Sequence, residues 1–321
     1  MKITAGLGCI DDYERLVKAG EDEVFCGFVP FEWNKKYGTL FPLNRREVLY
    51  YNVQIGSYED MKILKKMENK YKVPVTIAFN YLYYLEEQYE MIEDIMKKLI
   101  DIGFKEFIIA DLALLVYLKN KNLQCLIHLS GECMEVNTLS MEFLKDFNIS
   151  RYIFHRKNTI DDMKSCIEKN KELEYEAFIL NERCHYTGAF CSSFHCDELA
   201  HLCKVPYEFR KVNKECNKFN ITLEDKDVFT EDYESEDIEG EFYEFGSTGC
   251  GVCSLKKLKA AGVTHLKVVG RGNYIDIMEK DVMNLKKAIN MMDNINSEIK
   301  FQENIKDKII KGKCSGECYY L

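Results

Sequence analysis

The stretch VPVTIAFNYLYYLEEQYEMIEDIMKKLIDIGFKEFIIAD (residues 73–111) contains two apolar runs on either side of a helical pattern. Its ends, 73–80 and 105–111, are continuous runs rich in Val, Ile and Phe, which is typical of strands buried on both faces. Between them, residues 86–103 space their apolar side chains as one face of a helix, and Gly103 follows the last of these. The stretch therefore predicts a strand–helix–strand unit.

The same alternation of short β-rich runs and amphipathic stretches extends along the chain. Eight runs have the strand pattern, at 2–6, 22–27, 73–80, 105–111, 124–130, 151–155, 174–180 and 265–271. Eight strands with interleaved helices predict a TIM-type (β/α)8 barrel, and an open doubly wound sheet is the alternative. We expect one barrel domain over residues 1–300 and a C-terminal tail at 301–321.

Two segments interrupt this alternation. Residues 28–58 form an aromatic-rich segment after the second strand, and residues 181–263 form a long cysteine-rich insertion between the seventh and eighth strands. The insertion contains an acidic stretch at 221–245. Such a stretch favours a solvated loop, and a lid over the site is the alternative.

Composition limits the classes of function. The formal charge of −9 and the pI near 5.4 argue against a strongly electrostatic nucleic-acid binder, although a local basic groove stays open. We find neither a secretory signal pattern nor a run of about 18 apolar residues, so we expect a cytoplasmic protein without membrane spans. In a reducing compartment, the 14 cysteines are expected to be core residues and metal ligands rather than disulfides.

Polar residues lie at the predicted carboxyl ends of the strands, where (β/α)8 barrels carry their active sites. These residues are Asn80, Asp111, His128, Glu132, His155, Arg156 and Arg271. For each one alone, a structural hydrogen bond or a helix cap is the simpler role, and Asp111 is placed to cap the helix that follows it. Together they predict a polar pocket whose arginines bind the carboxylate or phosphate of an anionic substrate.

The segment NERCHYTGAFCSSFHCDELAHLC (181–203) adds four cysteines and three histidines on the same rim, and GCGVC (249–253) adds two thiols before the last strand. Their irregular spacing differs from the paired CxxC motifs of a zinc ribbon. Thiolate-rich sets bind zinc, copper(I) or iron–sulfur clusters, and spacing alone leaves zinc, iron–sulfur and unliganded thiols open. The histidines are zinc ligands or surface residues: His185, His195 and His201.

A further pair of cysteines lies in CSGEC, Cys314 and Cys318, near the C-terminal end of the sequence. Two interpretations apply to this pair. It is an additional metal or redox site, or it belongs to a frayed tail with two incidental thiols, and we favour the frayed tail.

These motifs resemble peptidase family U32, the collagenase-like peptidases, over nearly the whole chain. The most specific match is EAFILNERCHYTGAFC (176–191), a Glu-x-Phe strand followed by two cysteines with six residues between them. HLCKVPY (201–207) and CGVCSLKKLKAAGVTHLKVVGR (250–271) match later elements of the family. The resemblance implies a [4Fe–4S] cluster held by four thiolates: Cys184, Cys191, Cys203 and Cys250.

The chain also departs from the family pattern. Asn181, Glu182 and Arg183 stand where the family has a glycine, a small and an apolar residue, and Cys196 is offset from another family cysteine. Members of the family carry out oxygen-independent hydroxylation of a quinone precursor or of RNA bases, and others carry only the peptidase label. Because of these departures, the substrate is not carried over to this chain.

Three functions are expected from these observations, and we favour the first. It is an iron–sulfur redox enzyme acting on a small molecule or an RNA base, with its substrate bound by His128, Glu132, Arg156 and Arg271. The second is a peptidase with a zinc ion bound through Cys184, Cys191 and His185. The third is a non-catalytic iron–sulfur subunit that pairs with a second U32-type chain through an interface containing Cys26, Cys253 and residues 28–58.

Overall fold

Eight parallel strands form a closed barrel in chain order, and β8 pairs with β1 to close it. The computed structural model describes residues 1–38, 41–45, 53–184 and 243–320. The strands are β1 (Lys2–Leu7), β2 (Glu23–Gly27), β3 (Val75–Phe79), β4 (Glu106–Ile109), β5 (Leu126–Leu129), β6 (Ile149–Ile153), β7 (Glu174–Leu180) and β8 (His265–Val268). The predicted TIM-type (β/α)8 barrel is therefore confirmed, and the open sheet is wrong.

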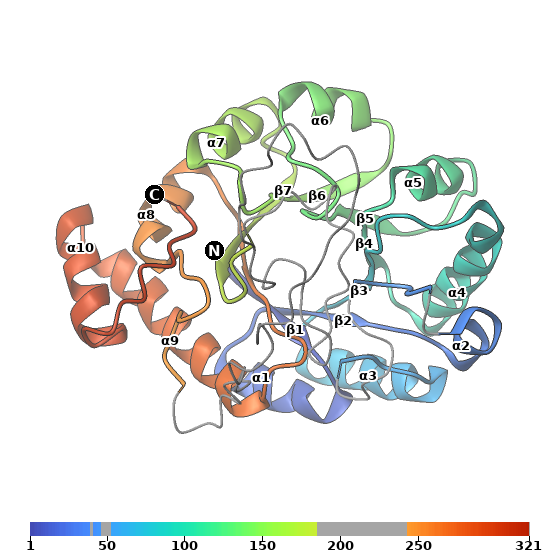
Figure 1. Ribbon diagram of the computed structural model, residues 1–321, viewed down its shortest axis with the longest axis horizontal. Coiled ribbons are helices and arrows are strands. Elements are labelled where there is room, and N and C mark those ends of the chain that lie inside the picture. The colour runs from blue at the N-terminus through green and yellow to red at the C-terminus, as the bar shows by residue number, and fades with distance from the viewer. Residues whose placement is uncertain (39–40, 46–52, 185–242, 321) are drawn as a thin grey trace, which may run out of the picture.

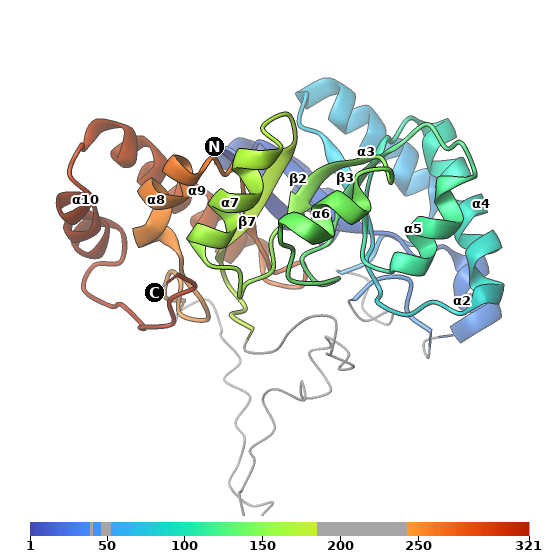
Figure 2. The same cartoon turned by 90° about the horizontal axis from the view of Figure 1, so that it is seen from above.

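Helices surround the barrel (Figure 1). They are α1 (Tyr13–Ala19), α2 (Phe31–Tyr37), α3 (Tyr58–Tyr71), α4 (Tyr89–Ile102), α5 (Leu112–Lys119), α6 (Thr138–Leu144), α7 (Ile160–Lys169), α8 (Leu255–Ala261), α9 (Ile275–Asn294) and α10 (Glu298–Asn304). Figures 1 and 2 both show α8, α9 and α10 grouped at one side of the barrel. No helix among the described residues is long and apolar enough to cross a membrane.

The stretch 73–111 forms β3, α4 and β4, as its pattern predicts. Helix α4 turns an apolar face toward the barrel and buries Ile92, Ile95 and Leu99. Gly103 ends the helix with a φ of 116°, a left-handed conformation that glycine adopts without a steric penalty. This cap reverses the chain so that β4 pairs in parallel with β3.

Both predicted interruptions contain regular structure. The segment 28–58 includes α2, and a parallel backbone pair between Phe28 and Ile55 ties its two ends to the barrel. The insertion is expected to extend to residue 263, but α8 and the 3-10 turn Val252–Ser254 occupy its last part. The helix that leads into β8 therefore begins within the span assigned to the insertion.

The described tail packs against the barrel, so the interpretation as a frayed tail is wrong. The amide of Cys250 donates to the carbonyl of Glu317 at 2.8 Å, and the amide of Tyr319 donates to the carbonyl of Cys250 at 2.9 Å. The hydroxyl of Tyr320 donates to the carbonyl of Phe178 in β7 at 2.6 Å. These bonds place the C-terminal residues beside the carboxyl end of β7.

Candidate functional site

A small pocket opens at the carboxyl ends of the strands and is called the barrel mouth here. Its lining combines apolar residues from inside the barrel with charged residues at the rim: Phe25, Arg45, Asn80, Ile108, Ser130, Gly131, Glu132, Ile153, Arg156, Phe178, Glu182, Lys267, Val269, Gly270 and Arg271. Its apolar floor belongs to a buried cluster that also includes Tyr319 of the tail. The barrel mouth therefore has an apolar base and a charged rim.

Glu132 lies between two arginines of the rim. Its carboxylate accepts a hydrogen bond from Nη1 of Arg156 at 2.5 Å, and Nε of Arg45 lies 3.8 Å from its other oxygen. The Arg156 guanidinium also lies over the Phe178 ring, 3.9 Å from its centroid. Burial opposes the charge of Arg156, but the Glu132 carboxylate keeps the pKa of Arg156 above its usual value. The Arg156 guanidinium is therefore held in its charged form next to Glu132.

Arg271 crosses the ends of β1 and β2, where two glycines leave room for it. A Cβ at Gly27 would lie 1.9 Å from Nη1 of Arg271, and one at Gly6 would lie 2.8 Å from Cγ of Arg271. Nη2 of Arg271 donates to Asn44 at 2.9 Å, and Asn44 and Gln54 exchange two hydrogen bonds of 2.9 Å. The two glycines and Asn44 thus hold a second guanidinium group at the barrel mouth.

The rim residues favour an anionic ligand. The guanidinium groups of Arg45, Arg156 and Arg271 outnumber the carboxylates of Glu132 and Glu182 in the lining. In a pocket that is largely shielded from water, such groups bind carboxylate or phosphate oxygens more strongly than they would at an open surface.

A larger groove adjoins the barrel mouth and shares Arg156 with it. It has a volume of about 760 Å³, within the usual range for small-molecule sites, whereas that of the barrel mouth is about 70 Å³. Its cationic side chains are Arg156, Lys157, Lys164, Arg183 and Lys257, and Asp161 also lines it. The barrel mouth therefore has room for one anionic group, and the groove has room for the rest of a ligand.

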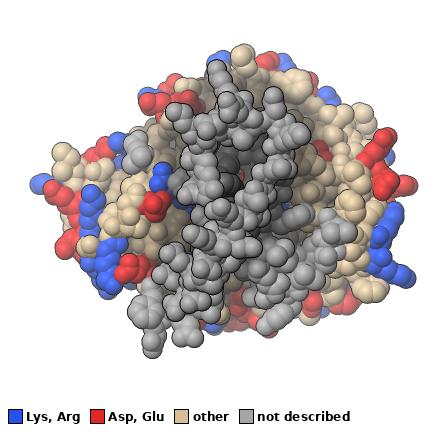
Figure 3. Space-filling model, viewed as in Figure 1, with Lys and Arg blue, Asp and Glu red and all other residues tan. Residues whose placement is uncertain are grey.

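Charges of both signs are interspersed around the described edge of the face seen in Figure 3. The basic character is thus local to the groove on α7, α8 and the residues after β6 and β7. This is the local basic groove that the overall charge of −9 leaves open.

The structure brings together four of the predicted strand-end residues and separates three. Asn80, Glu132, Arg156 and Arg271 line the barrel mouth. Asp111 caps α5 by accepting hydrogen bonds from the amides of Ala113 and Leu114, as expected. His155 is buried, its Nδ1 accepts from the amide of Lys157, and His128 lies deeper inside the barrel.

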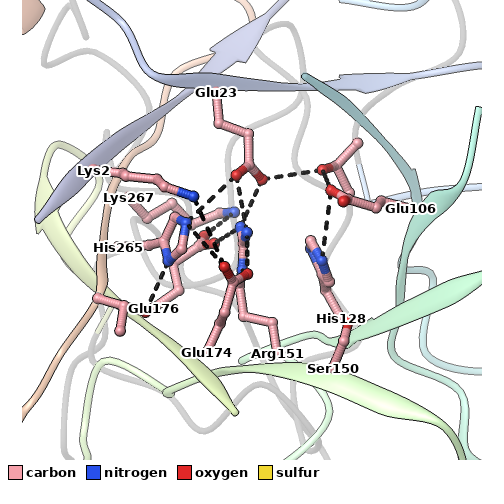
Figure 4. Close-up of polar contacts among 12 residues, drawn as sticks. Lys2, Glu23, Glu106, His128, Ser150, Arg151, Glu174, Glu176, His265 and Lys267 are labelled. Carbon is pink, nitrogen blue, oxygen red and sulfur yellow. Dashed lines mark hydrogen bonds and ion pairs between the residues drawn. The ribbon is translucent and has the colours of Figure 1, made fainter. Parts of the chain in front are cut away.

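The deeper barrel interior is filled by charged side chains, called the inner cluster here (Figure 4). At its centre, the buried Arg151 donates to Glu23 at 2.6 and 2.9 Å, to Glu174 at 2.6 and 3.0 Å, and to Glu176 at 3.1 Å. Lys267 donates to the other oxygen of Glu176 at 2.7 Å. Lys267 also lines the barrel mouth and lies over the Phe25 ring, so it connects the inner cluster with the apolar floor.

His128 belongs to the inner cluster, with Nε2 3.7 Å from Glu106. Burial, helped by the charge of Arg151, holds the pKa of His128 well below its usual value. His128, Glu106 and Glu23 form the one group among the described residues whose candidate metal-ligand atoms all lie within 4.8 Å of one another. Because Glu23 already receives two hydrogen bonds from Arg151, the geometry favours an ion-pair network at this place.

The cysteines of the family-type set are only partly described. Cys191, Cys196 and Cys203, and the histidines His185, His195 and His201, lie outside the described residues. The segments of Cys184 and Cys250 are paired, because the amide of Asn181 donates to Gly249 at 2.9 Å and that of Arg183 donates to Thr248 at 2.8 Å. Cys184 and Cys250 thus lie on adjoining segments, and Cys184 lines the groove.

Several residues of the site escape prediction from the sequence. Arg45, Asn44 and Gln54 come from the aromatic segment after β2, which has no periodic pattern. Tyr319 comes from the tail, donates to the carbonyl of Asn181 and is buried in the floor of the barrel mouth. The Tyr pair after CSGEC is the one signal that could have indicated a buried tail, since large aromatic side chains favour burial.

Comparisons with known proteins identify one family and several distantly similar solved structures. The model of peptidase family U32 matches residues 8–318. None of the curated proteins matches the sequence. Among solved structures, the U32 peptidase Mk0906 is 9% identical with a TM-score of 0.45, over 59% of this chain and 73% of that one. CdNal from Clostridium difficile in complex with mannosamine is 8% identical with a TM-score of 0.48, over 96% and 82%. Dihydrodipicolinate synthase from Bacillus clausii is 9% identical with a TM-score of 0.45, over 98% and 84%.

Proposed function

The chain belongs to peptidase family U32, and we propose that it is a redox enzyme that modifies an anionic substrate held at the barrel mouth. The reaction we propose is an oxygen-independent hydroxylation or a related modification, in which a hydroxylated co-substrate donates the oxygen atom and is itself reduced by two electrons. Its substrate is a small molecule or an RNA base that carries a phosphate or carboxylate. A [4Fe–4S] cluster bound by cysteine thiolates beside the barrel mouth is the proposed cofactor; zinc, which is not redox-active, would belong to the alternative function as a peptidase.

One observation carries this proposal: the rim arginine Arg156 and the cysteine-bearing segments line the same groove. Arg156 lines both the barrel mouth and the groove, and Cys184 lines the groove with it. Tyr319, the residue after Cys318, lines the groove together with Arg156 and is buried in the floor of the barrel mouth. A substrate bound by Arg156 would therefore lie close to a centre held by these thiols.

The residues of the rim have distinct roles in this proposal. Arg271 and Arg156 bind the anionic group, since a guanidinium donates two parallel hydrogen bonds to a carboxylate or phosphate. Glu132 holds Arg156 in place through its 2.5 Å hydrogen bond. The apolar floor formed by Phe25, Ile108 and neighbouring side chains limits the access of water from the inner cluster. His128 lies in the inner cluster, so in this proposal it acts on the substrate only indirectly, through the other residues of that cluster.

The described thiols suit the proposed cofactor because soft thiolates are the ligands of iron–sulfur clusters and of structural zinc. The family resemblance assigns Cys184, Cys191, Cys203 and Cys250 as ligands. A bound cluster would supply one-electron transfer next to the barrel mouth. The proposed function requires a redox-active thiolate centre at this place, whichever of the neighbouring cysteines bind it.

A cell-based comparison tests the proposed function. Small molecules and digested RNA from cells producing the wild-type chain, Arg271→Gln or Arg15→Gln under anaerobic conditions are compared by mass spectrometry. Arg15 is a surface residue paired with Asp276 and Glu279, so Arg15→Gln is the control. We expect a product heavier by one oxygen atom with the wild type and the control but not with Arg271→Gln, whose visible absorbance should be retained.

The same preparations distinguish the other functions. Zinc-dependent cleavage of peptides, with no iron bound, would replace the redox proposal by peptide hydrolysis. A second U32-type chain that co-purifies in equal amount, with no product difference, would favour a partner subunit. A product that is unchanged by Arg271→Gln would remove the barrel mouth as the substrate site.

A further inference from the structure

Four cysteines converge where the tail meets the end of β7, although they lie in two distant parts of the sequence. Cys250 and Cys253 have two residues between them, and Cys314 and Cys318 have three. Both spacings are those of paired thiolate ligands in structural metal sites. None of the four forms a disulfide.

The backbone joins the two pairs directly. Cys250 and Cys318 face each other as a parallel backbone pair, held by the hydrogen bonds of Cys250 to Glu317 and of Tyr319 to Cys250. Backbones paired in this way lie about 4.8 Å apart, and directly paired side chains point to the same side. The thiols of Cys250 and Cys318 are therefore neighbours.

The other two thiols lie around the same point. Cys253 follows Cys250 by three positions and lies within the 3-10 turn Val252–Ser254, so both sulfur atoms belong to one short segment. The loop of Cys314 is held there because the Ser315 hydroxyl donates to the carbonyl of Gly246 at 3.1 Å. A Cβ built on Gly246 would lie 3.1 Å from Sγ of Cys250, so this anchor is next to the Cys250 sulfur.

The local backbone also brings the two tail cysteines close together. Gly316 adopts a φ of 79° between Cys314 and Cys318 and lets the chain turn tightly there.

We propose that Cys250, Cys253, Cys314 and Cys318 bind a thiophilic metal centre that fastens the C-terminal tail to the barrel. Its ligands are four thiolates, which suit either a zinc ion or an iron–sulfur cluster. Among the described residues, no three of these sulfur atoms lie within 4.8 Å of one another. Binding of a single zinc ion, with Zn–S bonds of about 2.3 Å, would draw them together, and the exposed Cys314 would move most.

This proposal deepens the proposed function, because it names ligands for the thiolate centre beside the barrel mouth. It competes with the family-type set for one thiolate, since Cys250 belongs to both. In the family-type set, its partners are Cys184, Cys191 and Cys203. In the set proposed here, its partners include two cysteines of the tail, Cys314 and Cys318, so the two sets predict different effects of tail variants.

The test measures iron, zinc and acid-labile sulfide per chain in protein purified anaerobically from iron- and zinc-supplemented cells. The variants are Cys253→Ser, Cys314→Ser and Cys318→Ser, with Cys184→Ser for comparison. Cys9→Ser is the control, because Cys9 lies after β1, just before the 3-10 turn Ile10–Asp12, and outside this cluster. We expect Cys253→Ser, Cys314→Ser and Cys318→Ser each to lower metal affinity by at least about tenfold, because the loss of even an outer-shell partner of a metal site lowers affinity by about that factor. Cys184→Ser and Cys9→Ser should keep the metal.

A second measurement does not depend on metal content after purification. Trypsin cleavage at Lys308, Lys311 and Lys313 is followed with and without a chelator. We expect chelation to speed cleavage of the wild-type tail but not of Cys318→Ser, whose tail is already released. Circular dichroism of each variant verifies that the barrel is folded.

Each outcome has a defined meaning. Loss of metal in the tail variants with cleavage that responds to the chelator supports the site, and sulfide content then distinguishes a cluster from zinc. Full metal in Cys314→Ser and Cys318→Ser, with loss in Cys184→Ser, overturns it but leaves the proposed function standing on the family-type set. A folded wild-type chain without bound metal overturns both.

Discussion

Replacing Arg151 by methionine gives the sharpest test of the inner cluster. Arg151 is 2% exposed and pairs with Glu23, Glu174 and Glu176 from β2 and β7. Methionine replaces the unbranched stem of arginine but lacks the guanidinium, so the substitution leaves these carboxylates without their shared cation. Glu176 keeps Lys267, but Glu23 loses both of its hydrogen bonds from the guanidinium.

The size of the effect depends on the burial of the stranded carboxylates. The side chains of Glu23 and Glu176 are 3% and 1% exposed, whereas that of Glu174 is 41% exposed and is largely screened by water. Removing one partner of a buried ion pair costs about 3–5 kcal/mol. We expect Arg151→Met to lower the free energy of unfolding by an amount in this range at neutral pH.

Urea unfolding, followed by circular dichroism at pH 8 and at pH 5.5, is the assay. The pH dependence follows from the carboxylates: without Arg151 their folded-state pKa values rise, so the variant gains protons and recovers stability as the pH falls. In the wild type, the pKa of Glu176 is held at about 2 against burial by Lys267 and Arg151. That contribution is lost only as the pH falls from about 4.5 toward 2, below the assay range. The difference between wild type and variant should thus shrink at pH 5.5.

Arg15→Met is the matched control. Arg15 also bonds two carboxylates, those of Asp276 and Glu279, but its side chain is 42% exposed. Surface pairs contribute little because water screens them, so a much smaller change is expected. Equal losses of stability in the two variants, or a loss in Arg151→Met that does not change with pH, would refute a desolvated ion network inside the barrel.

Two further predictions concern backbone space and a buried acid. Gly27→Ala should displace Arg271 and weaken the binding of inorganic phosphate, measured by calorimetry, by about tenfold or more, because a charge-assisted hydrogen bond contributes about 1.5–3 kcal/mol. Gly56→Ala is the control: its Cβ would meet only a carbonyl oxygen at 4.0 Å, so this variant should bind phosphate like the wild type. Burial raises the pKa of Asp281 to about 7, although its hydrogen bond from Asn181 opposes this, so the folded state loses stability as the pH rises from about 4 to 7. Asp281→Asn should therefore stabilise the protein at pH 8 and have little effect at pH 4, and equal melting-temperature shifts at both values would contradict this.

The barrel could be predicted because its strands are short, separate apolar runs. Each of the eight predicted runs overlaps an observed strand, since strands buried between helices and barrel interior need apolar side chains on their outer faces. Local signals were equally reliable where one residue decides the geometry. Gly103 ends α4 in a left-handed conformation, and Asp111 caps α5.

The inner cluster could not be predicted, because its partners are far apart in the sequence. Glu23 and Arg151 are separated by 128 positions and meet only when the barrel closes. Within one apolar run of the sequence, an inward-facing charged residue cannot be distinguished from the polar residue that usually ends a strand. His128 illustrates the consequence: its position near the end of its run suggested the rim, but its side chain points toward Glu106 inside the barrel.

The candidate site could be predicted only in part. Glu132, Arg156 and Arg271 directly follow strands, so barrel geometry alone brings them together. Arg45 and Tyr319 come from segments without periodic pattern, and their positions depend on tertiary packing against the rim. The packing of the tail cysteines against the barrel could not be predicted, because nothing local in CSGEC indicates the backbone pairing of Cys318 with Cys250.

The central claim is that a redox-active thiolate centre lies beside the barrel mouth. The most direct measurement is the visible absorbance of the anaerobically purified chain before and after reduction by dithionite, with iron and sulfide quantified in the same sample. We predict a brown protein with about four iron and four sulfide per chain whose absorbance bleaches on reduction and returns on reoxidation. A colourless protein that binds one zinc ion and does not respond to dithionite would contradict the claim.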